Sequence, residues 1–174
     1  MVSMKTKSAL IADIDRLVGA VGDKFGIEMG GAGEGDAERE FIAERCPPRV
    51  AAAVHALPAL SMHLLDAIAD GPTGLIGLAA RSGRLKGTVS KHVQRLVEAN
   101  LVVRSPVPGN RKEIQLALTA DGERVVAAHR ELHDEMALGL QDFLRDYAVA
   151  DLRVIETVLR DLLAAKRVGV RLSR

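Results

Sequence analysis

The chain has 174 residues, of which 48% are hydrophobic and 27% are charged, and its formal net charge is +1. This composition is typical of a globular protein, and the length suits one domain or two interleaved lobes. No run approaches the roughly 18 apolar residues that a membrane-spanning helix requires, and no signal-peptide pattern opens the chain. The single cysteine, Cys46, excludes an intramolecular disulfide. We therefore expect a cytoplasmic protein.

The first part of the chain predicts helices joined by a linker. A long N-terminal helix is indicated by apolar residues at helical spacing, namely Leu10, Ile14, Leu17, Val18 and Val21. A segment rich in glycine and acidic residues follows at 26–37, and we expect a linker near 28–37. Short helices are expected at 37–45 and, after two prolines that suit a helix start, at 49–57.

The next region predicts a helix-turn-helix. One helix covers 59–70 and stops at Gly71–Pro72, and another covers about 75–81. Ser82–Gly83 supplies the tight turn, because glycine adopts unusual dihedral angles at little cost. A second helix, from Lys86 to Asn100, carries an apolar stripe that must face a core, formed by Val89, Val93, Leu96 and Val97.

The other side of this second helix suits contact with DNA. Small and hydrogen-bonding side chains can approach base edges in the major groove, and long cations can reach the flanking phosphates. This side carries Gly87, Ser90, Lys91, Gln94 and Arg95. The distribution is typical of a recognition helix.

A two-stranded hairpin is predicted after this helix. Residues 101–105 form a short run with β-branched valines, and residues 113–118 alternate apolar and polar side chains, so both segments suit strands. Residues 106–110 between them hold two prolines and Gly109–Asn110, which suit a turn. Arg111 and Lys112 lie where the tip returns, and narrow minor grooves attract inserted cations. Thr119 is placed to cap a following helix.

Positive charge concentrates in this region. From Arg81 to Lys112 there are eight basic residues against one acid, Glu98. Subtracting this local +7 from the whole-chain charge of +1 leaves about −6 for the remaining residues. Because Lys and Arg give DNA binding its sequence-independent affinity, the basic segment marks the expected contact surface rather than a merely solvated face.

From Pro58 to Glu123 the chain resembles the MarR-type transcriptional regulators. The resemblance rests on LAARSG, GTVSKHVQRL, the step from Asn100 to Arg104 into the first strand, and RKEIQLALTADG. It implies an obligate homodimer with a winged helix-turn-helix lobe in each subunit, bound to a palindromic operator. It also implies a repressor that a small ligand, an oxidant or a metal releases from DNA.

The resemblance extends to individual residues. It implies DNA contacts for Thr88, Ser90, Lys91 and Arg95, and a minor-groove role for Arg111. Two positions depart from the family pattern: Asn110 stands where an aspartate usually orients the wing arginine, and Leu85 stands where a polar residue usually caps the recognition helix. With the charge pattern, the candidate DNA-binding set is Lys86, Thr88, Ser90, Lys91, Gln94, Arg95, Arg111 and Lys112.

The flanking regions predict a helical dimerisation lobe. Residues 123–147 form a long helix whose apolar positions are Leu132, Met136, Leu140, Phe143, Leu144 and Tyr147, and a last helix carries Leu152, Ile155, Leu159, Leu162 and Leu163. A winged helix of about sixty residues has only a small core, so the apolar stripes of the flanking helices must be buried elsewhere. We expect them to pack against a partner subunit, and the alternative is that they pack against each other within one chain.

The expected fold is therefore mainly α with a small antiparallel β-hairpin. Residues 1–57 are N-terminal helices for dimerisation, 58–122 are the winged helix-turn-helix, and 123–174 are C-terminal helices for dimerisation. The winged helix-turn-helix lobe binds DNA, and the helical lobe is built from both ends of the chain.

The sequence marks candidate effector sites less clearly than it marks the DNA-binding residues. His129 and His133 share a helix face and could hold a metal if other elements supplied ligands, although a metal-independent pair is the favoured interpretation. The family resemblance implies a small aromatic or phenolic effector, which Arg16, His55 or His63 could bind. Cys46 has Arg45 and Arg49 beside it and is a candidate oxidation sensor, with an inert thiol as the alternative.

No catalytic motif is present, since the sequence contains no GxSxG, HExxH or phosphate-binding loop, and we expect neither an enzyme nor a cofactor. The predicted function is a sequence-specific, double-stranded-DNA-binding regulator. The alternatives are a metal-responsive regulator that uses His129 and His133, and a winged-helix protein-interaction module that does not read DNA.

Overall fold

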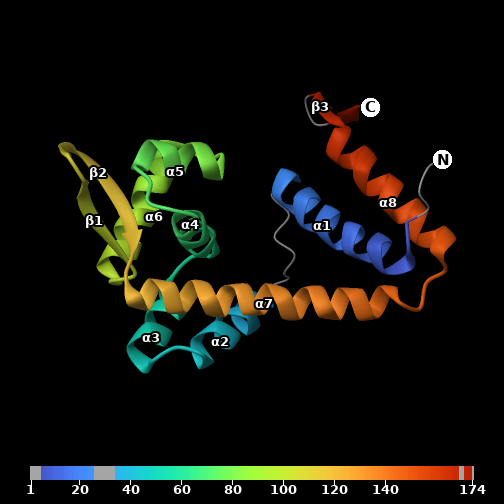
Figure 1. Ribbon diagram of the computed structural model, residues 1–174, viewed down its shortest axis with the longest axis horizontal. Coiled ribbons are helices and arrows are strands. Elements are labelled where there is room, and N and C mark those ends of the chain that lie inside the picture. The colour runs from blue at the N-terminus through green and yellow to red at the C-terminus, as the bar shows by residue number, and fades with distance from the viewer. Residues whose placement is uncertain (1–4, 26–33, 169–170, 174) are drawn as a thin grey trace. The chain divides into compact units, whose positions relative to one another are not determined.

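Figure 1 shows the computed structural model of the chain, which describes residues 5–25, 34–168 and 171–173. The described elements are mainly helical, with two small antiparallel sheets. In chain order they are α1 (Lys7–Phe25), α2 (Glu34–Glu44), α3 (Pro48–Ala56), α4 (Ala59–Ala69), α5 (Leu75–Ser82), α6 (Lys86–Glu98), β1 (Val102–Val107), β2 (Asn110–Leu118), α7 (Ala120–Leu144), α8 (Val149–Ala164), β3 (Lys166–Val168) and β4 (Arg171–Ser173).

The chain divides into two compact units, and the division falls within α7 between His133 and Asp134. The winged unit holds α2 to α6, β1, β2 and the first part of α7. The helical unit holds α1, the rest of α7, α8, β3 and β4. These units do not follow the predicted boundaries at 57/58 and 122/123, because the helices of residues 34–56 share a core with the winged helix-turn-helix.

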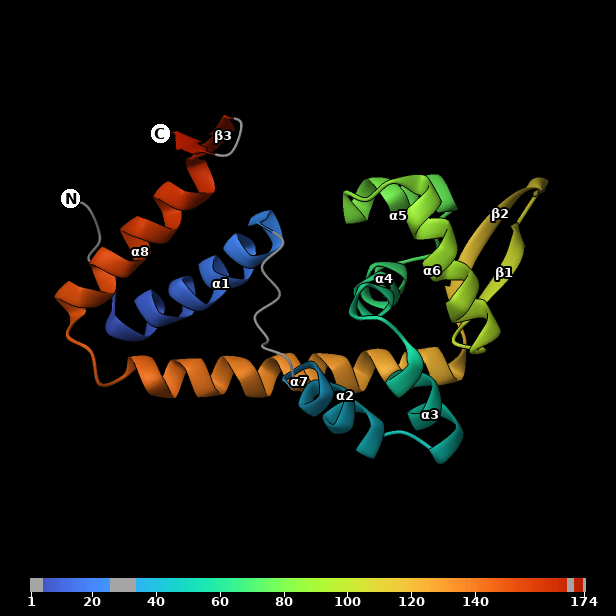
Figure 2. The ribbon, with the colours of Figure 1, turned by 180° about the vertical axis from the view of Figure 1, so that it is seen from behind.

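The core of the winged unit forms where the helical stripes converge. The stripe predicted on α6 is confirmed, with Val89, Val93 and Leu96 all fully buried and Val97 packed against them. Leu78 of α5 and Leu64, Leu65 and Ile68 of α4 join the same cluster. The cluster also includes Ile42 of α2, Val50 and Val54 of α3, and Val125 and Leu132 of α7. In Figures 1 and 2, α2 and α3 lie on one side of α7, and α4 to α6 lie on the other.

Two tight turns shape the helix-turn-helix and its exit into the hairpin. Gly83 ends α5 at φ 62°, in the left-handed region, as the predicted break between the two helices requires. Asn100 takes the same kind of conformation after α6, at φ 57°, and asparagine is one of the few residues that tolerate it. The chain can therefore leave α6 and pass directly into the hairpin.

The hairpin is longer than predicted. β1 pairs antiparallel with β2 from Val102 opposite Leu118 to Pro106 opposite Ile114, with an irregularity before Val107. Pro106, predicted to be in the turn, lies in β1, which has only β2 as a neighbour and so tolerates a residue without an N–H. Thr73 adds an isolated bridge to Leu116 on the other edge of β2, which ties the α4–α5 connection to the wing.

The wing leads directly into α7. The Thr119 hydroxyl accepts a hydrogen bond from the Gly122 N–H at 3.1 Å, which confirms the predicted cap. Gly122 lies so close to the end of α6 that a Cβ there would stand 2.1 Å from the Leu101 carbonyl oxygen. Only glycine fits this contact, so the first turn of α7 is pressed against the start of the wing.

The helical unit has its own apolar cluster. Leu10, Ile11 and Ile14 of α1 are buried together with Leu144 and Leu152, so α1 packs against α8 and the end of α7 within one chain. The Lys24 ammonium donates hydrogen bonds to the carbonyl oxygens of Leu162, Leu163 and Ala165, which lack partners at the end of α8. The β3–β4 hairpin that follows is not indicated by the sequence pattern.

One further sequence prediction concerns the N-terminal region. The expected linker is shorter than predicted, because residues 34–37 already belong to α2, and its remaining residues before 34 lie outside the described part.

No single helix in the described part is long and apolar enough to cross a membrane. The bent pair of α3 and α4 meets the criterion only by length and composition, and both helices contribute to the winged core.

Candidate nucleic-acid interface

Helix α6, the predicted recognition helix, presents its polar side to solvent. Five of the six α6 side chains in the predicted DNA-binding set are exposed, and Ser90 is half-buried: Lys86, Thr88, Ser90, Lys91, Gln94 and Arg95. Helical spacing places Thr88, Lys91, Gln94 and Arg95 away from the buried stripe, so the packing of α6 fixes which face is free. The first turn of α6 has no side-chain cap, and Leu85 at that position is 81% exposed.

A shallow groove runs along this exposed face. It is lined by Gly87, Ser90, Lys91, Gln94 and Arg95, and Glu98 and Arg104 complete it at the end nearest β1. The Gln94 amide nitrogen donates a hydrogen bond to Glu98 Oε1 at 2.9 Å. Arg104 was counted in the basic segment but not in the predicted site, and the groove adds it because β1 follows α6 directly.

One of the eight basic residues is used inside the fold. The Arg81 guanidinium donates to the carbonyl oxygens of Ala67 at 3.0 Å and Gly71 at 3.3 Å, near the end of α4. Ala67 lies in the last turn of α4, where carbonyls have no partner within the helix, and Gly71 follows the helix, so Arg81 stabilises this helix end. The number of cations available on the exposed face is smaller than the sequence count implied.

His92 anchors the recognition helix from its inner side. Its Nδ1 lies 2.8 Å from the hydroxyl oxygen of Ser61, a fully buried residue of α4. Partial burial lowers the pKa of His92, and the neighbouring Arg95 lowers it further. This contact between the His92 imidazole and a buried hydroxyl joins α6 to α4, a role that the sequence pattern of α6 did not reveal.

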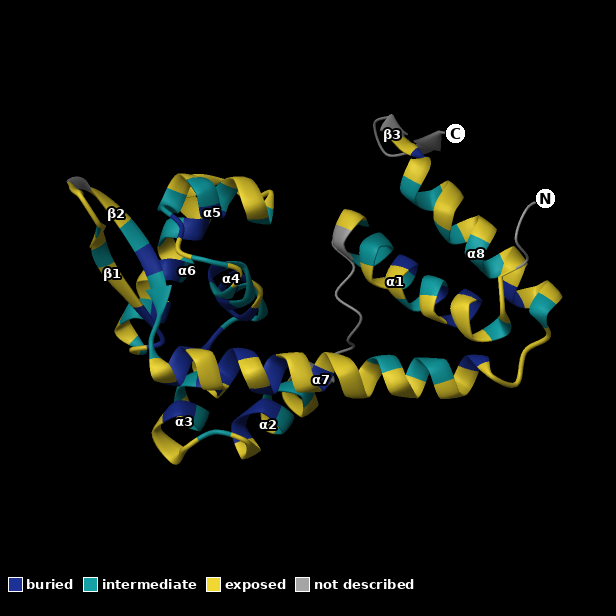
Figure 3. Cartoon of the chain, in the orientation of Figure 1, coloured by how far each residue is buried: buried dark blue, intermediate teal, exposed yellow. Residues whose placement is uncertain are grey.

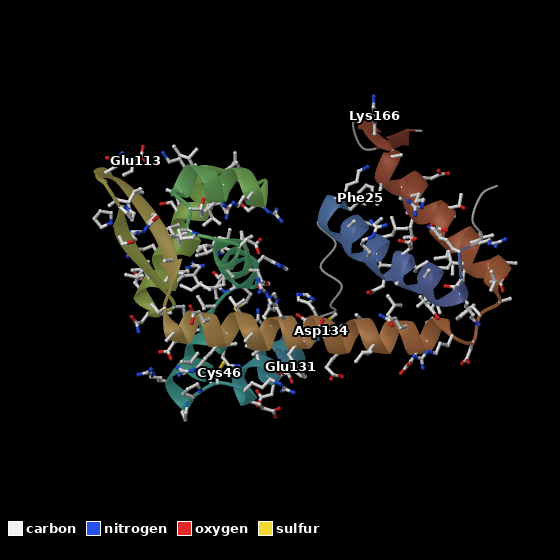
Figure 4. The ribbon with its side chains drawn as sticks, in the orientation of Figure 1. Phe25, Cys46, Glu113, Glu131, Asp134 and Lys166 are labelled. Atoms are coloured by element: carbon white, nitrogen blue, oxygen red, sulfur yellow. The ribbon has the colours of Figure 1, made fainter. Side chains whose placement is uncertain are left out.

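For the two predicted cations at the wing tip, the structure describes the backbone alone. Arg111 and Lys112 lie in β2, just after the turn at Gly109, where φ is 81°. Their side chains lie outside the described part of the structure. Glu113, the next residue, is exposed close to the wing tip (Figure 4).

Three histidines gather between α4 and α7. His129 is buried, and its Nδ1 lies 2.5 Å from a carboxylate oxygen of Asp66 on α4. The His129 ring is 4.5 Å from His133 and 6.0 Å from His63, measured between ring centroids. Desolvation lowers the pKa of His133, and the nearby His129 and His63 lower it further, whereas Asp66 and Glu38 oppose this shift.

The cluster does not form a ready-made metal site. Among the described residues, no three donor side chains converge in a group that could hold a metal ion. Within the described part of the chain, Asp66 Oδ1 is buried without a hydrogen-bond partner, and it forms an ion pair with Arg130 Nε at 3.5 Å. The sequence predicted the His129–His133 pair, whereas His63 and Asp66 join it only through the packing of α4 on α7.

The other predicted effector residues are not gathered into this cluster. Arg16 belongs to the helical unit and pairs with Asp13 on its own helix at 3.1 Å. His55 lies on α3 with its Nε2 3.6 Å from Glu40. Of the three predicted ligand-binding residues, only His63 lies beside other titratable rings.

Cys46 lies between α2 and α3, where burial raises the pKa of its thiol (Figure 4). The two flanking arginines are engaged elsewhere: Arg45 pairs with Glu131 at 3.1 Å, and Arg49 pairs with Asp121 at 2.7 Å. A raised pKa reduces the thiolate fraction, and the thiolate is the reactive form. The setting favours the inert thiol over the oxidation sensor.

The sequence shares its central region with known regulators. Residues 59–114 match the model of the MarR family. The chain is 32% identical over 78 residues to the uncharacterized HTH-type transcriptional regulator YvnA of Bacillus subtilis, covering 45% of this chain and 50% of that protein. It is 25% identical over 103 residues to the HTH-type transcriptional regulator PchR of the same organism, covering 59% of this chain and 61% of that one. The chain thus spans only half to three fifths of these relatives.

Solved structures share the fold. ZitR of Lactococcus lactis in complex with DNA superimposes with a TM-score of 0.56 at 19% identity, covering 62% of this chain and 74% of that one. The adhesin competence repressor AdcR of Streptococcus pyogenes gives 0.54 at 16% identity, covering 62% and 79%. These likenesses show the fold, and the family model matches the segment that carries α4, α5, α6 and most of the wing. The segment of residues 59–114, which carries this winged helix-turn-helix, is thus similar to the MarR family.

Proposed function

We propose that this protein is a sequence-specific regulator of transcription that binds double-stranded DNA. The observation that carries the proposal is the exposed polar face of α6, on which Lys91 and Arg95 lie beside the hydrogen-bonding Ser90 and Gln94. Cations neutralise phosphates and supply affinity, and the uncharged groups between them can select base edges. The buried stripe of the same helix supports the assignment, because it holds this face outward.

The regulator acts as a homodimer in this proposal. Although α1 and α8 cover each other within one chain, apolar side chains remain exposed in the helical unit, including Phe143 at 62% and Val154 at 64%. Val158 follows Val154 by one helical turn on α8 and is also exposed. A second copy of the chain would cover this face and would present a second recognition helix.

The dimer sets the expected form of the DNA site. Two recognition helices related by a twofold axis read a palindrome whose half-sites are about one helical turn, or 34–36 Å, apart. We propose that the wing cations Arg111 and Lys112 reach the adjacent minor grooves. The protein would act in the cytoplasm as a repressor of genes next to its own, and a small aromatic or phenolic effector near His63 would release it.

A footprint on the DNA flanking its own gene tests the proposal. We expect protection of two half-sites one helical turn apart, weakened steeply by added salt, and the same footprint repeated with phenols and aromatic acids tests the effector. If no duplex is bound even at low salt while the chain assembles with another protein, the protein-interaction alternative replaces the regulator.

A second candidate function is favoured by the histidine cluster, namely control by a divalent metal. His129, His133 and His63 supply imidazole nitrogens, and Asp66 next to His129 Nδ1 resembles the carboxylate that orients a metal-bound histidine. One of the superimposed structures is that of a zinc-responsive MarR family member, ZitR. Because no three donors converge among the described residues, metal binding would require side chains of the cluster to rearrange.

Equilibrium dialysis with Zn²⁺ followed by elemental analysis tests this second function. We expect about one retained metal per chain, lost in His129→Ala and His133→Ala but kept in His55→Ala, whose imidazole lies outside the cluster. Equal retention by all four proteins would exclude the cluster as the site.

A further inference from the structure

Glu98 stands out because it is an acid on a face that otherwise carries cations. It is the one acidic residue between Arg81 and Lys112, and it lies four residues after Gln94 and seven after Lys91. This spacing places all three side chains on one stripe of α6. Glu98 also lines the same groove as Arg95 and Arg104, so its carboxylate stands on the surface assigned to DNA.

The structure shows what holds this carboxylate. Glu98 Oε1 accepts a hydrogen bond from the Gln94 amide nitrogen at 2.9 Å, and within the described residues no ion pair joins Glu98 to a cation. The charge is therefore not cancelled by the arginines around it. Any duplex that settles on this face must bring phosphates close to an exposed negative charge.

On this basis we propose that Glu98 is a specificity-determining residue. The inference rests on the proposed DNA-binding function. Its charge disfavours binding to arbitrary DNA, because such binding depends on electrostatic attraction to phosphates. Its hydrogen bond orients the Gln94 amide, so that correct base contacts can compensate for the repulsion. Base contacts at a cognate site offset the repulsion between Glu98 and the phosphates, whereas a random site lacks these contacts.

The same hydrogen bond indicates which base Gln94 selects. One N–H of the Gln94 amide is held by Glu98, which leaves the carbonyl oxygen and the second N–H for DNA. An acceptor beside a donor matches the N6 amino group and the N7 of adenine in the major groove. We therefore expect one adenine in each half-site to depend on Gln94.

The experiment begins with selection of a preferred duplex from a randomised library by the wild-type chain. Affinities are then measured for that duplex and for a scrambled one. Glu98→Gln removes the charge but keeps an oxygen that can accept from Gln94. Glu44→Gln is the matched control, because it removes one exposed acid of α2, on the opposite side of α7 from α6 within the same unit (Figure 2).

We expect Glu98→Gln to bind the scrambled duplex about fivefold more tightly while gaining less on the preferred duplex, so that the specificity ratio falls. Glu44→Gln should leave that ratio unchanged. Substituting 7-deazaadenine, which lacks N7, at successive adenines of the half-site should weaken the wild type about tenfold at one position. Gln94→Ala should be insensitive to that substitution.

The outcomes distinguish a failure of the Glu98 inference from a failure of the proposed DNA-binding function. If the wild type selects a duplex but Glu98→Gln keeps the same specificity ratio, or Glu44→Gln lowers the ratio equally, the role of Glu98 is wrong while DNA binding stands. If no 7-deazaadenine position depends on Gln94, the adenine assignment is wrong. A wild type that selects no duplex overturns the proposed function and, with it, this inference.

Discussion

The winged unit and the helical unit expose different kinds of surface. In the winged unit the apolar stripes of α4, α5 and α6 meet in one core, and the recognition helix is left with cations and amides facing solvent. In the helical unit α1 and α8 bury Leu10, Ile14 and Leu152, yet Phe143 and Val154 remain exposed. Figure 3 shows that burial also differs along α7, whose first half carries most of its buried residues.

This difference indicates different partners. A polar, cationic surface over a complete core is suited to a nucleic acid, because charge attracts phosphates without destabilising the fold. An apolar surface beside a small core is suited to a second protein chain, because burying that area is favourable. Substitutions in the winged unit should therefore alter stability or DNA contacts, and substitutions on the exposed apolar face of the helical unit should alter dimerisation.

The largest effect is expected from Gly122→Ala in the winged unit. The new Cβ would meet the Leu101 carbonyl oxygen at 2.1 Å, so the start of α7 must shift, and we expect a loss of about 3 kcal/mol in unfolding free energy. Gly139→Ala is the control on the same helix, because nothing lies within 4 Å of its Cβ, and it should stabilise by about 1 kcal/mol. Chemical denaturation measures both, and equal effects would contradict the close contact.

Next in size is the double substitution Val154→Asp with Val158→Asp on α8. Charges on this exposed apolar face should prevent dimerisation, and the loss of paired binding should weaken operator affinity about 100-fold. Sedimentation velocity and a binding titration measure the two effects. Arg153→Asp, also exposed on α8, is the control, and a double variant that stays dimeric would show that the interface lies elsewhere.

Arg111→Ala in the wing should weaken operator binding about tenfold without lowering the melting temperature. The loss of a minor-groove contact accounts for this size. A gel-shift titration measures the affinity, with Glu113→Ala, the neighbouring exposed wing residue, as the comparison. Unchanged affinity of the arginine variant would refute the wing assignment.

The smallest effect concerns pH and the histidine cluster. Because the pKa of His133 is lowered in the folded chain, the unfolded chain binds more protons just below pH 6.5. Stability should therefore rise with pH up to about 6.5 and fall as pH drops below it. Since His133 is exposed and solvent screens its interactions, the change is about 0.5 kcal/mol. His133→Gln should flatten this slope in melting curves from pH 5 to 7, and His55→Gln should keep it.

Local patterns allowed much of the winged unit to be predicted from the sequence. The stripe on α6, the turn at Gly83 and the cap at Thr119 each depend on residues a few positions apart, and all three are confirmed. Strand ends were less predictable, because Pro106 is compatible both with a turn and with an edge strand.

Features that depend on distant residues could not be predicted. His63 and His129 are 66 positions apart and meet only because α4 packs on α7. Arg81 counts as a cation in the sequence, yet the fold directs it to carbonyls at the end of α4. The union of α2 and α3 with the winged core likewise depends on tertiary packing, which helical periodicity does not specify.

The salt dependence of DNA binding tests the central claim most directly. Lys91→Ala in both subunits of a dimer removes two phosphate contacts, so the slope of log affinity against log salt concentration should become shallower by about two. Lys166→Ala, on β3 of the helical unit, should keep the wild-type slope. If Lys91→Ala also keeps the wild-type slope, the exposed face of α6 does not contact the DNA backbone, and the account is contradicted.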